Sequence, residues 1–210
     1  MRKLVIPYQN AKSLLQNGDV LLFRSRGIIP FFIQKAGYSN YNHVGMLDKV
    51  DDSTFKIIEF REFKGFQEVP LDIYINVKCT IDVFRPKSSF IQSYLVINAD
   101  TDKYHIKSEE IKYKPEDTIL LFKTMNKMPY GWERIAIMMI RHIPFLRLFI
   151  SPEVDDLSEP NYIYPVCSTA VATCLRKTYI DPVPTLADYC VEPGDLGRSL
   201  LFDYLFTIGV

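Results

Sequence analysis

"YPVCSTAVATCLRKTY", residues 164–179, contains the boundary that decides the fold, because an extended segment turns into a helix at Cys167. Pro165 and Val166 disfavour helix, whereas the following residues favour it and place apolar side chains at helical spacing. We predict a helix that begins at Cys167, whose thiolate the free N–H groups and dipole of the first turn would stabilise. The alternative is that Cys167 is a buried core residue, as most free cysteines are.

Composition limits the class of protein. The chain has 210 residues, 48% of them hydrophobic, which suits one domain with a sizeable core. Lys plus Arg and Asp plus Glu both number 25, and the sequence has no long basic run, so we predict no nucleic-acid partner. The four cysteines lack the paired spacing of zinc sites, so we expect free thiols in a reducing compartment, with no metal and no cofactor.

The sequence contains neither a signal-peptide pattern nor a run of about 18 apolar residues. These observations predict a cytoplasmic protein without a membrane span. The most apolar segment, residues 135–150, has Arg141 and Arg147 interspersed, and two interpretations stay open for it. It is either a buried helix that covers the sheet or a surface that makes peripheral contact with a membrane.

The N-terminal part of the chain is predicted to be mostly antiparallel sheet. Residues 20–23 form a buried strand after an Asn-Gly-Asp turn, and residues 43–62 contain two apolar strands around an Asp-Asp-Ser-Thr turn. Two more strands are expected within residues 65–75 and 78–86, and a short helix after Pro30. The turn and its two flanking strands predict a β-hairpin.

The C-terminal part is predicted to contain two helices and to close with Pro-rich loops and a short helix or strand. Pro115 and the acidic residues after it are typical of a helix start, and the cysteine helix follows later. Residues 87–113 are strand-like in patches, and we interpret them and residues 135–160 as insertions. The simplest reading is a single α+β domain over residues 1–210.

A nucleophilic cysteine needs a histidine base, and the sequence offers His43, His105 and His142. His105 lies in the charged segment 87–113, and His142 lies among arginines that would depress its protonation. His43 begins the strand "HVGML" directly after a loop, so its side chain is both rigidly held and reachable. We predict that His43 is the base that partners Cys167.

The histidine needs an acceptor that orients its ring, and the second hairpin strand supplies Glu59 and Glu62. A three-residue turn at residues 50–52 would place Glu59 directly opposite His43, whereas another register would bring Glu62 there. Spacing alone does not choose between them. The apolar neighbours of Glu59 in "KIIEF" favour it, because a buried carboxylate needs a partner.

The order of these motifs resembles the permuted papain-like NlpC/P60 superfamily, and within it the YiiX/YebB-like branch, which includes a poxviral member. The segments that carry the resemblance are "NGDVLLFRS", "YNHVGML", "IIEF", "MPYG", "YPVCSTAVATCLRKTY" and "VEPGDLGRS". In those proteins the histidine strand precedes the cysteine helix, which is the reverse of the papain order, as His43 precedes Cys167 here. The resemblance implies a circularly permuted papain-like fold, with an antiparallel sheet packed against the cysteine helix.

The resemblance also implies roles for particular residues. Cys167 would be the nucleophile, His43 the base and Glu59 the third polar residue of the catalytic set. The "PYG" motif matches a family position near the active-site groove, so substrate-binding roles are implied for Pro129, Tyr130 and Gly131.

The function implied is that of a cysteine hydrolase or acyltransferase that works through a thioester. An amide substrate would make it a peptidase or amidase, with cell-wall peptides typical of the wider superfamily, and an acyl-lipid substrate would make it a lipid hydrolase or acyltransferase. The alternative is a binding or virion-associated module of the same fold with an inactive site. A metal hydrolase is disfavoured because the histidines show no HxH or HExxH spacing.

Overall fold

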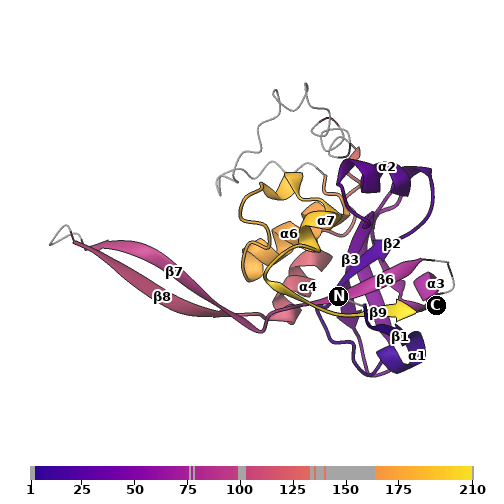
Figure 1. The fold of residues 1–210 in the computed structure, drawn as a ribbon, viewed down its shortest axis with the longest axis horizontal. Coiled ribbons are helices and arrows are strands. Elements are labelled where there is room, and N and C mark those ends of the chain that lie inside the picture. The colour runs from indigo at the N-terminus through magenta and orange to yellow at the C-terminus, as the bar shows by residue number, and fades with distance from the viewer. Residues whose placement is uncertain are drawn as a thin grey trace.

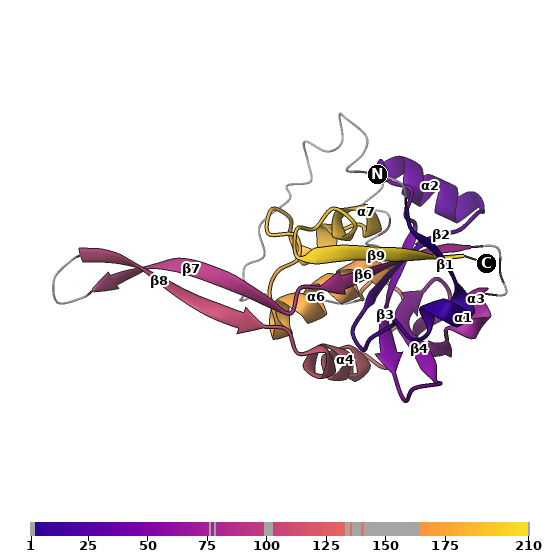
Figure 2. The same cartoon turned by 60° about the horizontal axis from the view of Figure 1, so that its bottom comes forward.

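The computed structural model describes residues 3–75, 77, 79–98, 103–132, 135, 140 and 164–209. These residues have a mixed α+β fold, in which a seven-stranded sheet carries helices on both faces (Figure 1). A second sheet of two strands projects from this body as a long hairpin (Figure 2). The α+β class predicted from the sequence is therefore confirmed.

The main sheet is antiparallel except at one edge. Its strands are β1 (Val5–Pro7), β2 (Val20–Arg24), β3 (His43–Lys49), β4 (Phe55–Arg61), β5 (Gly65–Pro70), β6 (Thr80–Pro86) and β9 (Phe202–Gly209). They lie in the order β1-β9-β6-β2-β3-β4-β5, and β1 runs parallel to β9. The C-terminal strand thus lies between the first strand and β6, a placement that the sequence patterns did not predict.

Two apolar layers hold the helices to the sheet. The described helices are α1 (Tyr8–Ala11), α2 (Ile28–Ala36), α3 (Asp72–Ile75), α4 (Pro115–Thr124), α6 (Cys167–Thr178), η2 (Asp188–Cys190, a 3-10 turn) and α7 (Pro193–Leu196). On β2, Val20 and Leu22 join the core under α4 and α6, whereas Leu21 and Phe23 join the core on the opposite face with α1 and α3. Successive strand residues point to opposite faces, so β2 is apolar from Val20 to Phe23 because both faces are covered.

Helix α6 begins at the predicted residue, and its first nine residues are buried. The Thr169 hydroxyl accepts a hydrogen bond from the Val166 N–H at 2.9 Å, which satisfies a donor at the helix start. The Ser168 hydroxyl donates to the Val191 carbonyl at 2.6 Å and ties the first turn to the loop before α7. The N-terminus of α6 is therefore fixed on two sides, and with it the position of Cys167.

The predicted hairpin is formed by β3 and β4, but its turn is longer than three residues. Lys49 pairs with Phe55, so five residues lie between the strands. Asp51 explains the extra length, because its Oδ1 accepts hydrogen bonds from the N–H groups of Ser53 and Thr54, each at 2.8 Å. The register therefore differs by two positions from the one that a three-residue turn at residues 50–52 would give.

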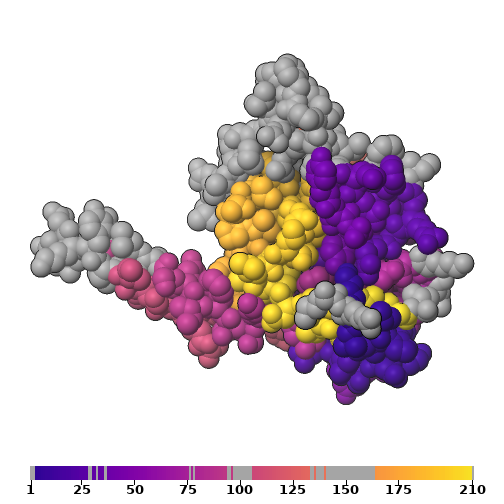
Figure 3. All heavy atoms as spheres, viewed as in Figure 1, coloured from indigo at the N-terminus to yellow at the C-terminus, as the bar shows by residue number. Residues whose placement is uncertain are grey.

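The predicted insertion at residues 87–113 forms the projecting hairpin of β7 (Ser89–Asn98) and β8 (Lys103–Lys112). The two strands pair without a bulge from Ser89 with Lys112 to Asn98 with Lys103. The described part of the arm extends away from the body in the space-filling view of Figure 3. The other predicted insertion, 135–160, lies almost entirely outside the described residues, and so does the segment 135–150.

Candidate functional site

The site is built around a contact between His43 and Glu59. The imidazole Nε2 lies 2.6 Å from Glu59 Oε2, and the two residues are only 6% and 0% exposed. The register that pairs Met46 with Ile58 places Glu59 opposite Gly45, so His43 contacts Glu59 diagonally and not directly across the hairpin. The directly paired register considered for a three-residue turn is thus not formed, but both residues lie on one face because the shift is two residues.

Gly45 lies on this face between the two side chains. A Cβ atom there would lie 2.5 Å from Ile57 Cγ2 and 3.4 Å from Glu59 Cβ. No side chain fits without displacing Ile57, so the glycine keeps open the space that the diagonal contact crosses. A glycine inside the strand "HVGML" is the sequence signal for such a close approach.

The other carboxylate oxygen of Glu59 is also satisfied. Gln67 Nε2 and the Tyr74 hydroxyl both donate hydrogen bonds to Oε1, and Arg61 Nη1 lies 3.9 Å from it. Burial by itself raises the pKa of Glu59, but the charge of His43 and these hydrogen bonds outweigh burial and lower the pKa. Glu59 is therefore a buried, ionised carboxylate. Sequence reasoning missed the contributions of Gln67 and Tyr74.

Cys167 is the third member of this group. Burial lowers the pKa of His43, but the nearby charges of Glu59 and Cys167, with the hydrogen bond to Glu59, raise the pKa to about 10. Since Nε2 faces Glu59, Nδ1 is the ring nitrogen left for the thiol. The structure thus brings together His43, Glu59 and Cys167, and the imidazole is held in its protonated form at neutral pH.

The "PYG" residues lie beside the cysteine. The Gly131 N–H donates to the Pro165 carbonyl at 3.0 Å, which joins the motif to the segment that enters α6. Tyr130 is 5% exposed, and burial, with the charge of Cys167, raises its pKa. Pro129 packs against β5, where its Cα lies 3.1 Å from the position that a Cβ on Gly65 would occupy. The structure thus places Tyr130 and Gly131 near Cys167 and Pro129 against β5, and the substrate-binding roles of all three residues stay predictions.

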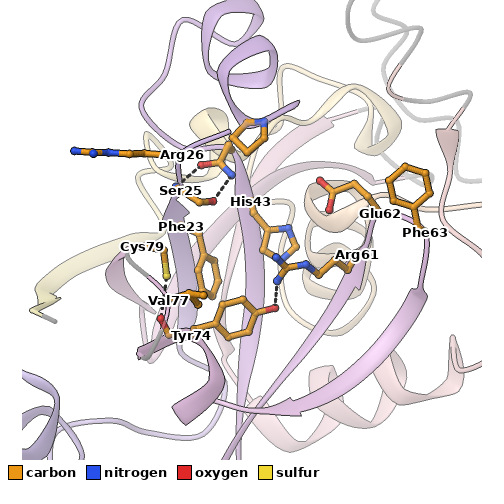
Figure 4. A pocket seen from close by; sticks show the side chains of 12 residues that line it. Phe23, Ser25, Arg26, His43, Arg61, Glu62, Phe63, Tyr74, Val77 and Cys79 are labelled. Carbon is orange, nitrogen blue, oxygen red and sulfur yellow. Dashed lines mark hydrogen bonds between the residues drawn. The ribbon is translucent and has the colours of Figure 1, made fainter. Parts of the chain in front are cut away.

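A pocket of about 550 Å³ opens on the side of His43 that faces β4 and α3 (Figure 4). It is large enough for a small organic ligand. Glu62, the alternative partner of His43, lies on its wall, so the structure brings Glu59 to the imidazole and Glu62 to the pocket. The lining residues are Phe23, Ser25, Arg26, Pro30, Asn42, His43, Arg61, Glu62, Phe63, Tyr74, Val77 and Cys79.

The remaining histidines and cysteines are placed differently. His105 lies in the projecting arm at the register position opposite Val96, and His142 lies outside the described residues. Cys174 is completely buried in α6 and packs in the core between this helix and the sheet. Within the described part of the chain, no group of three or more His, Cys, Asp or Glu residues is arranged to hold a metal ion.

The fold and site define a mixed α+β protein with a buried cysteine, histidine and glutamate in contact. No protein-family model matches the chain, and no curated protein matches it. Among solved structures, the chain is similar to the metalloprotein yiiX (DUF1105) from Escherichia coli O157:H7, at 17% sequence identity and a TM-score of 0.46. The alignment covers 92% of this chain and 96% of that chain.

A search of the described residues for a membrane-crossing helix found none of sufficient length and apolar character.

Proposed function

We propose that this protein is a papain-like cysteine enzyme of the permuted NlpC/P60 type, which transfers acyl groups through a thioester on Cys167. One observation carries the proposal: a buried imidazole lies between an ionised carboxylate, Glu59, and a thiol at the first residue of a helix. A nucleophile, a base and a group that orients the base are the parts that covalent acyl transfer needs.

The electrostatics support a charged resting state. The pKa of His43 of about 10 means that the imidazole carries a proton at neutral pH and can give it to the leaving group. Glu59 accepts from Nε2, which fixes the ring so that Nδ1 faces the thiol. The Cys167 thiolate attacks the carbonyl carbon, and the first-turn N–H groups of α6 stabilise the oxyanion that develops.

The second half of the reaction follows from the same charges. Once Cys167 is acylated, its negative charge is lost, and one of the causes that raise the pKa of His43 is lost with it. The imidazole, having given its proton to the leaving group, then acts as a base toward water or an alcohol. The same residue therefore serves as acid in acylation and as base in deacylation.

The experiment is active-site acylation with p-nitrophenyl acetate, followed by intact mass and release of p-nitrophenol. We expect one acetyl group per chain on Cys167 and a loss of several orders of magnitude in rate in Cys167→Ala. Cys174→Ala is the matched control, because this cysteine is seven residues along the same helix and burial raises its pKa to about 12.

Cys174→Ala should acetylate like the wild type. If Cys167→Ala releases p-nitrophenol as fast as the wild type, the proposed function is wrong, and a binding protein with an inactive site becomes the better interpretation.

A further inference from the structure

Phe63 occupies a position that neither its backbone preference nor burial explains. It lies in the turn between β4 and β5 with a φ of 64°, the left-handed region that bulky residues rarely adopt. Its side chain is 82% exposed, so the ring gains little from the protein's own core. Such strain persists where the surroundings enforce it, and it is common at ligand-binding positions.

The surroundings of the turn do enforce this conformation. The Lys64 N–H donates to the Arg61 carbonyl at 3.1 Å and closes the turn, and the Phe66 N–H donates to the Met128 carbonyl at 3.2 Å. Gly65 approaches the same segment so closely that a Cβ there would lie 2.5 Å from the Met128 oxygen. The turn is therefore pinned to the chain just before the "PYG" motif.

A chain of aromatic contacts leads from this turn to the nucleophile. The Phe63 ring lies 4.8 Å from the Trp132 ring, centroid to centroid, and Trp132 lies 5.3 Å from the ring of Tyr130. Tyr130 in turn packs in the same core cluster as Cys167 and feels its charge. Phe63 also lines the pocket that His43 borders, as Figure 4 shows. The two exposed rings thus form a series of contacts that runs from the pocket wall to Tyr130.

We propose that Phe63 and Trp132 form an aromatic platform that binds the apolar part of the acyl group while its carbonyl carbon lies at Cys167. The proposal deepens the proposed function, on which it rests for the role of Cys167. Trp132 is 40% exposed, so both rings have apolar surface that a bound chain or ring would cover. The substrate class is an acyl donor with an apolar group next to the reacting carbonyl, supplied either by a fatty acyl chain or by an aromatic aminoacyl group.

The sequence contains one tryptophan, so the emission of Trp132 reports on the platform without any turnover. We would titrate the full chain with methyl octyl ketone, an uncleavable stand-in for a fatty acyl group, and with benzylacetone, a stand-in for an aromatic aminoacyl group. Acetone is the control that carries the carbonyl alone. We expect a saturable shift of the emission to shorter wavelength with at least one of the larger ketones and none with acetone.

Phe63→Gly removes the ring from a backbone conformation that glycine adopts without strain, so the variant should fold with a Tm no lower than that of the wild type. We expect its Kd for the tighter ketone to rise about tenfold. Tyr38→Gly is the matched control, because Tyr38 is also aromatic, 85% exposed and at a positive φ of 44°, but does not line the pocket. Phe63→Asn is the second variant, because asparagine also tolerates the left-handed backbone conformation at this position.

The same titration in Cys167→Ala separates the two proposals, because binding to the platform needs no thiol. Saturable binding in Cys167→Ala supports the platform even if p-nitrophenyl acetate never acylates the wild type. A tighter fit for methyl octyl ketone indicates fatty acyl groups, and a tighter fit for benzylacetone indicates aromatic aminoacyl groups. The platform proposal is overturned if no ketone gives a saturable change, or if Phe63→Gly binds with the affinity of the wild type.

Discussion

Glu59 on β4 and Asp82 on β6 are both completely shielded from solvent, yet their surroundings differ in kind. Glu59 contacts a histidine and accepts from two neutral donors, Gln67 and Tyr74. Asp82 is held by two cations and two hydroxyls, with Arg24 Nη2 at 2.8 Å, the Tyr41 hydroxyl at 2.6 Å, the Thr207 hydroxyl at 2.5 Å and Lys3 Nζ in contact.

The two carboxylates differ in whether their partners can exchange a proton near neutral pH. Burial raises the pKa of Asp82, but its contacts with Lys3, Thr207 and Tyr41 outweigh burial and lower the pKa, as also happens at Glu59. Lysine and arginine keep their protons at neutral pH, so the Asp82 group ties the N-terminus and β9 to the sheet and moves no proton. The partner of Glu59 is an imidazole, which can exchange its proton and lies near a thiol.

The largest effect that this comparison predicts is on turnover. Glu59→Gln should lower the rate of acyl transfer by about 10²- to 10⁴-fold, because the ring loses the charge that orients it and stabilises its protonated form. Release of p-nitrophenol measures this rate. Asp82→Asn is the control and should stay within about threefold of the wild type. Similar losses of rate in the two variants would show that the two carboxylates do not differ in their effect on acyl transfer.

The second effect is on the protonation of His43. In Glu59→Gln the Coulombic cause that raises the pKa of His43 is removed, so the pKa should fall from about 10 toward its ordinary value near 6.5. An NMR titration of the imidazole Cε1–H signals, assigned with a His43→Gln variant, measures both values. A pKa that stays near 10 in Glu59→Gln would show that Glu59 is not the cause.

The same shift has a consequence for stability. The folded pKa of His43 lies above the unfolded value, so the folded state binds more protons between about pH 6.5 and 10. The stabilisation is complete below the unfolded pKa and is lost as the pH rises through the folded pKa. The difference in Tm between wild type and Glu59→Gln should therefore shrink as the pH rises toward 10.

The third effect is on stability at the other carboxylate. Asp82→Asn should lower the free energy of unfolding by about 2 kcal/mol, because Lys3 and Arg24 lose their counter-charge. The loss of unfolding free energy is smaller than for a fully buried ion pair, because the side chains of Lys3 and Arg24 are 44% and 27% exposed and water can solvate them. Urea unfolding measures it, and an unchanged midpoint would argue against the structural role of Asp82.

The smallest effect is expected at Tyr74. Tyr74→Phe removes one hydrogen bond to Glu59 but leaves His43 and Gln67 in place, so it should cost about 1 kcal/mol of stability. The loss of acyl transfer should be several-fold and smaller than that of Glu59→Gln. Urea unfolding and p-nitrophenol release on one preparation give both numbers. A loss as large as that of Glu59→Gln would mean that Tyr74 takes a direct part in the reaction.

Much of the site was predictable because its signals are local. The switch from Pro165 and Val166 to an apolar helical stripe located the start of α6, and the strand "HVGML" located His43. The apolar strand around Glu59 indicated that this carboxylate would need a partner, and the structure supplies His43. Each of these inferences depends on side-chain periodicity or on the end of a helix or strand within about ten residues, and both can be recognised directly in the sequence.

The diagonal contact could not be predicted, because the turn that sets the register depends on hydrogen bonds made by Asp51. Each side chain still lies on the expected face of the sheet, because a register shift of two residues does not change the face. Tyr74 was expected in a strand but lies in α3, where its hydroxyl reaches Glu59. A strand-like composition was overridden there by the packing of α3 onto the sheet.

The sequence by itself determined strands β2 to β6, the start of helix α6 at Cys167 and which faces of these elements are apolar. These properties follow from side-chain spacing and backbone preference over a few residues. The tertiary structure alone decided that β9 lies between β1 and β6, that Gln67 and Tyr74 complete the surroundings of Glu59, and that Phe63 meets Trp132. Such contacts join residues that are distant in the chain. They are selected by the packing free energy of the whole molecule, so no short stretch of sequence predicts them.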